Sequence, residues 1–345
     1  MFGAFNTFGK LGSPAGSRSL LAQIQAMGAS FIGIPSLSNY QDSAGTTLVT
    51  QPGGGAADPP VGKVLDLSGL GNHASQSTST ARPKLSARVN LLTYTEDFSN
   101  EAWTKTALTV STSELLVPTV TNTQHSIIYT ASLPTAESWT VEAKAAGYKK
   151  ISLREGGTTG AWVVVDLSTG LFVASGAGLT GYTITVLSDG YVRVTLQKST
   201  SGFGAKISFL PDSYTSGDPN GVAFAGDGVS GVLVRKPQLE LGSTATRYQR
   251  VTGNGNYDYS GFPFVHVFDG VDDAHVITFP SSLGSACTVV TANRSTTPTI
   301  QTGQTIGTSY TITTSHAGKI IFPRALTAGE TAIVTAWATK QGAIA

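Results

Sequence analysis

The sequence predicts an all-β protein built from two antiparallel β-sandwich domains, and three observations support this prediction. Only 12% of the 345 residues are charged, whereas glycine alone accounts for 40 of them. Several segments alternate apolar with polar side chains, as half-buried strands do. Turn signals, such as residues 166–170 and 187–190, separate these segments. The combination favours many short strands joined by tight turns, and the chain is long enough for two domains of ordinary size.

Two short helices are expected, one near each end of the chain. Residues 18–28 carry apolar side chains at helical spacing and end at Gly28, a common helix terminator. Residues 326–342 begin with Thr327 and Glu330, whose spacing is that of a capping box. The apolar positions of the two helices are Leu20, Leu21, Ile24, Met27, Ile333, Val334 and Trp337. Both helices are therefore amphipathic and should pack against another element.

Most of the chain between these helices is predicted to be strand and turn. Residues 138–145 direct Trp139 and Val141 to one face and polar side chains to the other. An antiparallel strand with one solvated face requires this pattern. The same alternation recurs in residues 149–155 and 191–198, so Trp139 is expected in a core between two sheets.

The overall composition excludes several classes of partner and site. A net charge of +1 creates no field that would attract nucleic acid or an anionic membrane. The single cysteine, Cys287, excludes intramolecular disulfides and multi-cysteine zinc sites, and its strand-like surroundings predict a buried thiol. No apolar window approaches the roughly 18 residues of a membrane span, and the N-terminus lacks the pattern of a secretory signal. We therefore expect neither nucleic acid nor a membrane as a partner.

Two glycine-rich stretches, residues 51–60 and 251–261, suggest exposed loops. The residues from Asn90 to Val251 have the length and turn spacing of a complete sandwich. A self-contained domain is therefore expected inside the chain.

The segments on either side of this domain share one resemblance. Residues 40–52 (YQDSAGTTLVTQP) and 61–85 (VGKVLDLSGLGNHASQSTSTARPKL) resemble the first part of the laminin-G or concanavalin-A-like jelly rolls of bacteriophage tail and virion proteins. Residues 268–276 (FDGVDDAHV) resemble the strand that follows almost directly in that family, but here about 180 residues intervene. Residues 319–343 resemble the last strand and terminal helix of the same family.

The intervening segment resembles a different module, a carbohydrate-binding-like jelly roll common in phage structural proteins. The matching pieces occur in order at residues 90–105 (NLLTYTEDFSNEAWTK), 161–170 (AWVVVDLSTG), 189–196 (DGYVRVTL) and 231–251 (GVLVRKPQLELGSTATRYQRV). The chain departs from this family at VRKP, residues 234–237, where an aromatic and small residues are more usual.

The two resemblances together imply that one jelly roll is inserted into another. The expected domains are an N-terminal arm at residues 1–33, a split laminin-G-like jelly roll at 34–88 and 255–345, and the inserted jelly roll at 89–254. Such an insertion is favoured at exposed loops when the termini of the inserted domain lie close together. It predicts that residues 61–85 share a sheet with residues 264–280.

Calcium is the one ion that the sequence suggests, because laminin-G-like sandwiches sometimes hold it through loop carboxylates and carbonyls. The predicted ligands are Asp66, Asn72, Asp269, Asp272 and Asp273. Oxygen ligands suit Ca²⁺, but aspartate and asparagine also stabilise turns through their own hydrogen bonds. The turn role is the favoured interpretation, and no other cofactor is expected.

Exposed aromatic side chains in the inserted module would be sugar-stacking platforms if it binds a glycan, as the resemblance implies. Trp103, in a polar loop, and Trp162, in a segment that is apolar on both faces, are the two predicted ligand contacts.

Catalytic motifs are missing from the sequence. Residues 176–181 match G-x-G-x-x-G, but they precede a strand rather than the helix that a dinucleotide site needs. His266 and His275 flank the FDGVDD segment and could meet across a hairpin, yet zinc wants three or four converging ligands, so a structural role is favoured. No nucleophile elbow is present, and the protein is not expected to be an enzyme.

The resemblances imply a non-enzymatic virion protein, located in a tail fibre, a baseplate or a capsid decoration. The alternatives are an adsorption protein that binds host-surface glycans and, more remotely, a polysaccharide-degrading enzyme. An attachment role is predicted for the apolar residues Phe2, Phe5, Phe8 and Leu11 of the arm, since exposed apolar groups are a liability on a free monomer. The expected partners are other virion proteins and further copies of the chain, with a trimer as the expected assembly.

Overall fold

The computed structural model describes residues 19–133, 137–155, 160–199, 202–294 and 296–344. The described chain is all-β with two α-helices, in agreement with the predicted fold class. It divides into two compact units, which are described separately below. Unit 1 combines the described residues up to Val49 with Pro60–Leu85 and Phe264–Ala343, and unit 2 consists mainly of Thr50–Pro59 and Ser86–Pro263.

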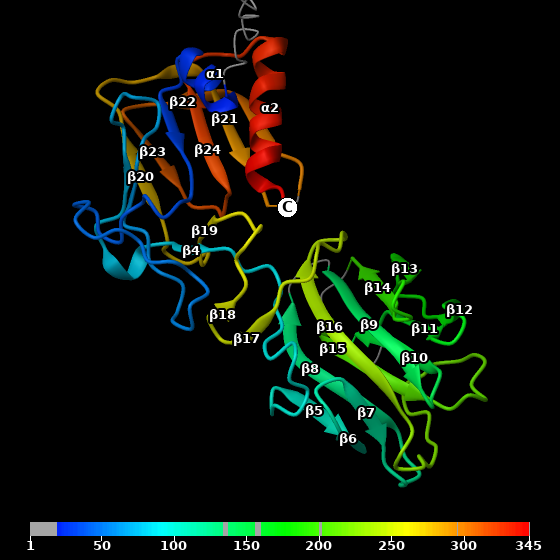
Figure 1. Ribbon diagram of the computed structural model, residues 1–345. Coiled ribbons are helices and arrows are strands. Elements are labelled where there is room, and N and C mark those ends of the chain that lie inside the picture. Colours follow the sequence, from blue (N-terminus) through cyan, green and yellow to red (C-terminus); the bar gives the residue numbers. More distant parts are fainter. Residues whose placement is uncertain (1–18, 134–136, 156–159, 200–201, 295, 345) are drawn as a thin grey trace, which may run out of the picture. The chain divides into compact units, whose positions relative to one another are not determined.

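Unit 1 contains two four-stranded antiparallel sheets and a two-stranded ribbon (Figure 1). The first sheet has the order β1 (Phe31–Gly33), β24 (Gly318–Phe322), β21 (Gly284–Ala292) and β22 (Thr299–Ile306). The second has the order β2 (Lys63–Val64), β3 (Ala74–Ser75), β20 (His275–Thr278) and β23 (Ser309–Ile312). The ribbon pairs β4 (Lys84–Ser86) with β19 (Val265–Val267).

Strands that are far apart in sequence close this unit. Ala74 of β3 pairs with Ile277 of β20, and Ser75 pairs with Val276. Residues 61–85 and 264–280 therefore share a sheet, as the sequence predicts. The two sheets enclose a core that includes Val64, Ile277 and Ile321 from different strands.

The two helices cover the outer face of the first sheet. α1 (Leu20–Ala26) and α2 (Ala328–Gly342) contribute Ile24, Val334 and Trp337 to a second core with Ile320 and Phe322 of β24. Ile321, between those two, points to the opposite core, because successive side chains of a strand alternate between its faces. The capping box predicted at the start of α2 is present, and α1 ends just before Gly28, whose φ is +78°.

The arm predicted at residues 1–33 is too long. Residues 20–33 form α1 and β1, with Phe31 paired to Ile321. Phe31 and Ile32 are 1% and 0% exposed, so these residues belong to unit 1. The attachment residues Phe2, Phe5, Phe8 and Leu11 lie outside the described residues.

Unit 2 is a sandwich of two six-stranded antiparallel sheets. One sheet has the order β12 (Leu171–Ser175), β11 (Trp162–Asp166), β10 (Lys150–Glu155), β15 (Gly202–Leu210), β8 (His125–Leu133) and β5 (Trp103–Thr106). The other has the order β13 (Gly181–Val186), β14 (Val192–Lys198), β9 (Glu137–Ala146), β16 (Gly231–Leu241), β7 (Leu115–Pro118) and β6 (Leu108–Val110). A hairpin of β17 (Val251–Gly253) and β18 (Asn256–Tyr257) follows.

The core of unit 2 lies between these sheets and contains the predicted Trp139, which is 1% exposed. The strand expected at residues 138–145 is β9, but its polar face is not solvated throughout, because Glu142 is 1% exposed. Residues 50–59 belong to this unit rather than to the outer jelly roll, since Tyr257 donates a backbone hydrogen bond to Gly53 and its hydroxyl donates to Asp58.

Candidate functional site

The acidic turn of unit 1 brings three of the predicted calcium ligands together. The carboxylates of Asp269, Asp272 and Asp273 lie within 4.8 Å of one another. The Oδ1 atom of Asp269 accepts the backbone N–H of Val271 at 2.8 Å, and Asp273 accepts the backbone N–H of Asp269 at 2.9 Å. Backbone N–H groups that donate to the Asp269 carboxylate, with that of Val271 first, hold the pKa of Asp269 below its usual value. The hydrogen bonds agree with the turn role, and calcium binding stays a prediction.

Asp66 and Asn72 occupy a different loop, and Asp66 is not part of that carboxylate group. The Asp66 carboxylate accepts hydrogen bonds from the backbone of Ile32 at 3.0 Å, Ser68 at 2.9 Å and Asn72 at 3.0 Å. The Asn72 amide donates to the carbonyl of Ser30 at 2.8 Å. Both side chains therefore fasten their loop to the start of β1.

Trp103 is a core residue rather than an exposed platform. It lies on β5, is 0% exposed and packs edge-on against Phe98 and Tyr129, with ring centroids 5.1 and 5.3 Å apart. Its indole N–H donates to the carbonyl of Tyr94 at 3.0 Å. The prediction of a sugar contact at Trp103 is wrong, because a buried ring offers no face to a ligand.

Trp162 is half-buried on the outer face of β11. Its neighbours Val163 and Val165 enter the sandwich core, whereas Trp162 packs beside Val164 and Tyr214 in a small outer cluster. The apolar character of both faces of this strand is thereby explained. A sugar contact at Trp162 stays a prediction.

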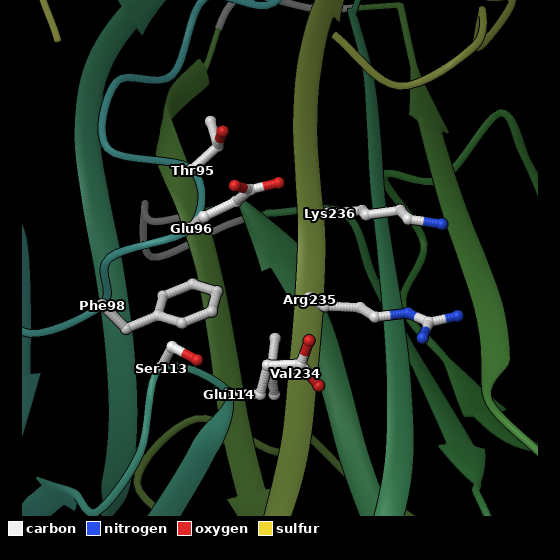
Figure 2. A pocket seen from close by; sticks show the side chains of 8 residues that line it. All are labelled: Thr95, Glu96, Phe98, Ser113, Glu114, Val234, Arg235 and Lys236. Atoms are coloured by element: carbon white, nitrogen blue, oxygen red, sulfur yellow. The ribbon is translucent and has the colours of Figure 1, made fainter. Parts of the chain in front are cut away.

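A cavity of about 430 Å³ opens in unit 2 beside β16 (Figure 2). It is lined by Thr95, Glu96, Phe98, Ser113, Glu114, Val234, Arg235 and Lys236. Figure 2 shows the Arg235 and Lys236 side chains extending away from Glu96 and Phe98. Beside Phe98 the cavity therefore offers hydroxyl and carboxylate oxygens, which accept hydrogen bonds.

The cavity lies where β16 departs from regular pairing. The register between β9 and β16 shifts between Arg235 and Gln238, and Lys236 has a φ of +50°. That conformation is uncommon for a residue with a side chain. The irregular stretch coincides with VRKP, the point at which the sequence departs from the family it resembles. Val234, which is paired with Ala143 of β9, donates its backbone N–H to the carbonyl of Glu114 at 2.8 Å.

The two cations of this stretch are held by Glu142 of β9, a buried carboxylate. Arg235 and Lys236 approach its Oε2 atom at 2.8 and 3.2 Å, and Arg193 approaches Oε1 at 2.6 Å. Burial raises the pKa of Glu142, but hydrogen bonds from these three cations outweigh burial and leave the pKa below its usual value. Glu114 accepts the hydroxyl of Tyr191 at 2.5 Å. Most of the charge around the cavity is thus paired within the protein.

An exposed aromatic pair that the sequence analysis did not identify lies at the other side of unit 2. Phe172 of β12 and Tyr182 of β13 stack with ring centroids 5.2 Å apart and an interplanar angle of 18°. The two residues are 44% and 41% exposed. β12 and β13 are each the terminal strand of their own sheet. The two rings meet because the two sheets pack together, so the sequence alone did not reveal this aromatic pair.

Three buried histidines meet in unit 1. The rings of His266 and His275 lie 5.4 Å apart, so the two residues meet as anticipated, and His316 lies 5.3 Å from His266. Among the described residues, the only group with the ligand-atom spacing of a metal site is the aspartate group described above. The structural role expected for His266 and His275 stays a prediction.

The chain matches no protein-family model, and no curated protein is significantly similar to it. Among the helices in the described ranges, none is long and apolar enough to cross a membrane.

Proposed function

We propose that the protein is a non-enzymatic structural component of a bacteriophage particle, in a tail fibre, a baseplate or a capsid decoration. The pairing of β3 with β20 supports this proposal, because it joins the two segments that resemble the separated parts of one virion jelly roll. Unit 2 supports it further by forming its own sandwich core between them. The functional step rests on the resemblance, since a fold alone does not specify a function.

Attachment is assigned to the first 18 residues, which precede α1. A phage that encodes the protein without residues 2–18 should produce folded protein with unchanged thermal unfolding, absent from purified particles. Removal of residues 2–33 is an unsuitable test, because it deletes β1 and the buried Phe31. Immunogold labelling of intact particles is the companion measurement. Normal incorporation of the shortened protein would contradict the attachment role, and unlabelled wild-type particles would contradict the structural role.

We propose self-association as part of this function, with a trimer as the assembly. Both β12 and β13 are terminal strands, and neither LFVAS nor GYTITV contains a charged residue. Uncharged terminal strands favour pairing with another chain. Light scattering of the purified protein should give three times the 35.6 kDa chain mass. A mass of one chain at all concentrations would contradict this part of the proposal.

A second candidate function is recognition of a host-surface glycan by unit 2. The cavity beside β16 and the Phe172–Tyr182 pair favour it, since sugar sites combine aromatic surface with a few polar groups. A glycan array probed with the full chain tests binding, and Glu96→Gln and Tyr182→Ala separate the two locations. Release of reducing ends from any bound glycan would indicate hydrolysis instead. Absence of binding to every glycan on the array would contradict glycan recognition, and the structural role would be the remaining proposal.

A further inference from the structure

β19 is the strand by which the chain re-enters unit 1. The chain passes into unit 2 after Leu85 and returns to unit 1 at Phe264. β4, at the exit, and β19, at the return, pair with each other as a two-stranded ribbon. Whatever fastens β19 to the body of unit 1 therefore controls how firmly this return connection is held.

His266 and His316 provide such a fastening through their backbones. The N–H of His266 donates to the carbonyl of His316 at 3.0 Å, and the N–H of His316 donates to the carbonyl of His266 at 3.1 Å. The two imidazole rings lie edge to face, with centroids 5.3 Å apart. The hydroxyl of Ser315 accepts the N–H of Phe268 at 3.0 Å and extends the contact by one side chain.

Both rings are buried in a way that suits only their neutral forms. His266 is 0% exposed and His316 is 3% exposed. The Asn39 amide donates to the carbonyl of Ile34, and its nitrogen also lies 3.1 Å from Nε2 of His266. This ring nitrogen is therefore an acceptor, and Nδ1 of His266 has no hydrogen-bond partner. His316 donates from Nδ1 to the carbonyl of Thr314 at 2.9 Å.

Within the part of the chain that the structure describes, the titratable groups that act on the two rings are bases. His275 of β20 acts on both rings, and Lys319 of β24 acts on His316. Burial, followed by these neighbours, holds the pKa of His266 well below its usual value and lowers the pKa of His316 to about 3. Burial also lowers the pKa of Lys319 to about 8. In acid, the protonated rings would be like charges beside one another and beside the ammonium group of Lys319 in a dry interior, which is unfavourable.

We propose that His266 and His316 form an acid-sensitive latch that fastens β19 to unit 1 at neutral pH and releases it when the rings take up protons. Since the exposed rings bind protons more strongly than the buried rings, the stabilisation is complete above about pH 6.5 and is lost progressively as the pH falls below it. Release would loosen the connection through which the chain returns from unit 2.

Amide hydrogen exchange of the full chain at neutral pH and at about pH 4.5, corrected for intrinsic rates, tests the latch. At a pH about two units below the usual histidine pKa, a ring takes up a proton when it is exposed but stays neutral when it is buried. Each such ring therefore shifts the equilibrium toward the open form by about 100-fold. Peptides that contain residues 264–268 and 313–318 should therefore exchange about 100-fold faster or more in acid. Peptides from β9 and β16 of unit 2 provide the internal reference.

A double variant, His266→Gln with His316→Gln, should lose most of this acid response. His125→Gln is the matched control: His125 is also buried, but its two ring nitrogens lie 2.7 and 2.8 Å from the carbonyl oxygens of Ala107 and Phe224. Because a variant could fail to fold, the ring nitrogens of wild-type histidines should also be followed by NMR. Unchanged exchange in acid, or rings that titrate near pH 6.5 without any increase in exchange, would overturn the latch. Slower exchange on addition of Zn²⁺ at neutral pH would overturn it in favour of a metal site.

Discussion

The two units bury polar side chains in opposite ways. In unit 2, the buried Glu142 is surrounded by Arg193, Arg235 and Lys236 and remains ionised. In unit 1, His266 and His316 are surrounded by an amide, carbonyl groups and other bases, and they remain neutral. A buried charge is tolerated when it is paired, whereas an unpaired ionisable group stays neutral. The comparison predicts that different substitutions, and different ranges of pH, change the stability of each unit.

Removal of a core tryptophan should have the largest effect and should stay within one unit. Trp103→Ala removes a ring that packs against Phe98 and Tyr129, and such a loss costs about 4 kcal/mol of unfolding free energy. Denaturant unfolding should show the loss in the transition of unit 2 alone. Trp337→Ala is the counterpart in unit 1, where it removes a side chain of α2 that is 2% exposed. It should affect the transition of unit 1. Unchanged stability of Trp103→Ala would restore its interpretation as a surface residue.

Removal of the paired carboxylate should have the next largest effect. Glu142→Gln leaves three cations without their shared acceptor, and breaking a buried ion pair from one side costs about 3 kcal/mol. Since the pKa of Glu142 lies below its usual 4.5, its contribution is present above that pH and is lost as the pH falls further. Denaturant unfolding of the variant at neutral pH measures the loss. Asp189→Asn, which changes an exposed partner of Arg235, is the control and should have a much smaller effect.

A smaller effect is expected at the start of α2. Thr327→Ala removes the side-chain acceptor for the N–H of Glu330, and loss of an N-cap costs about 1 kcal/mol. The transition of unit 1 should shift and that of unit 2 should not. Thr327→Ser retains the acceptor and should restore wild-type stability. A shift of both transitions would show that the units do not unfold separately.

The smallest effect is expected from a chelator. Asp269 already accepts backbone N–H groups within its turn, so EDTA should leave the thermal unfolding of unit 1 unchanged. Thermal unfolding with EDTA and with added Ca²⁺ checks this expectation. Stabilisation by Ca²⁺ that Asp272→Asn abolishes would establish the calcium site and reject the turn role as a sufficient account.

Local signals predicted individual elements well, whereas contacts between distant segments were predicted only in part. The spacing of Thr327 and Glu330 predicted the start of α2, and the pattern around Trp139 predicted β9. Both predictions succeeded because helix caps and strands depend on residues that are neighbours in sequence. The pairing of β3 with β20 followed from the resemblance. The role of β1 was missed, since only its pairing with β24 shows that Phe31 is buried.

The sites show the same division. Trp103 was wrongly predicted to be exposed because polar residues are near it in sequence. In the fold, its ring packs against Phe98 and Tyr129. His266 and His275 were recognised as neighbours because they flank one short turn, but His316 joins them from a distant segment. The cavity depends on the irregular backbone at Lys236, which VRKP signalled only as a departure from a family pattern.

The central claim is that unit 1 folds from separated segments around an independent unit 2. The most direct test replaces residues 87–262 by a short glycine-serine linker and measures denaturant unfolding of the shortened chain. The account predicts a cooperative transition that matches that of unit 1 in the intact protein, because β1 to β4 and β19 to β24 retain their partners. A shortened chain with no cooperative transition would contradict it.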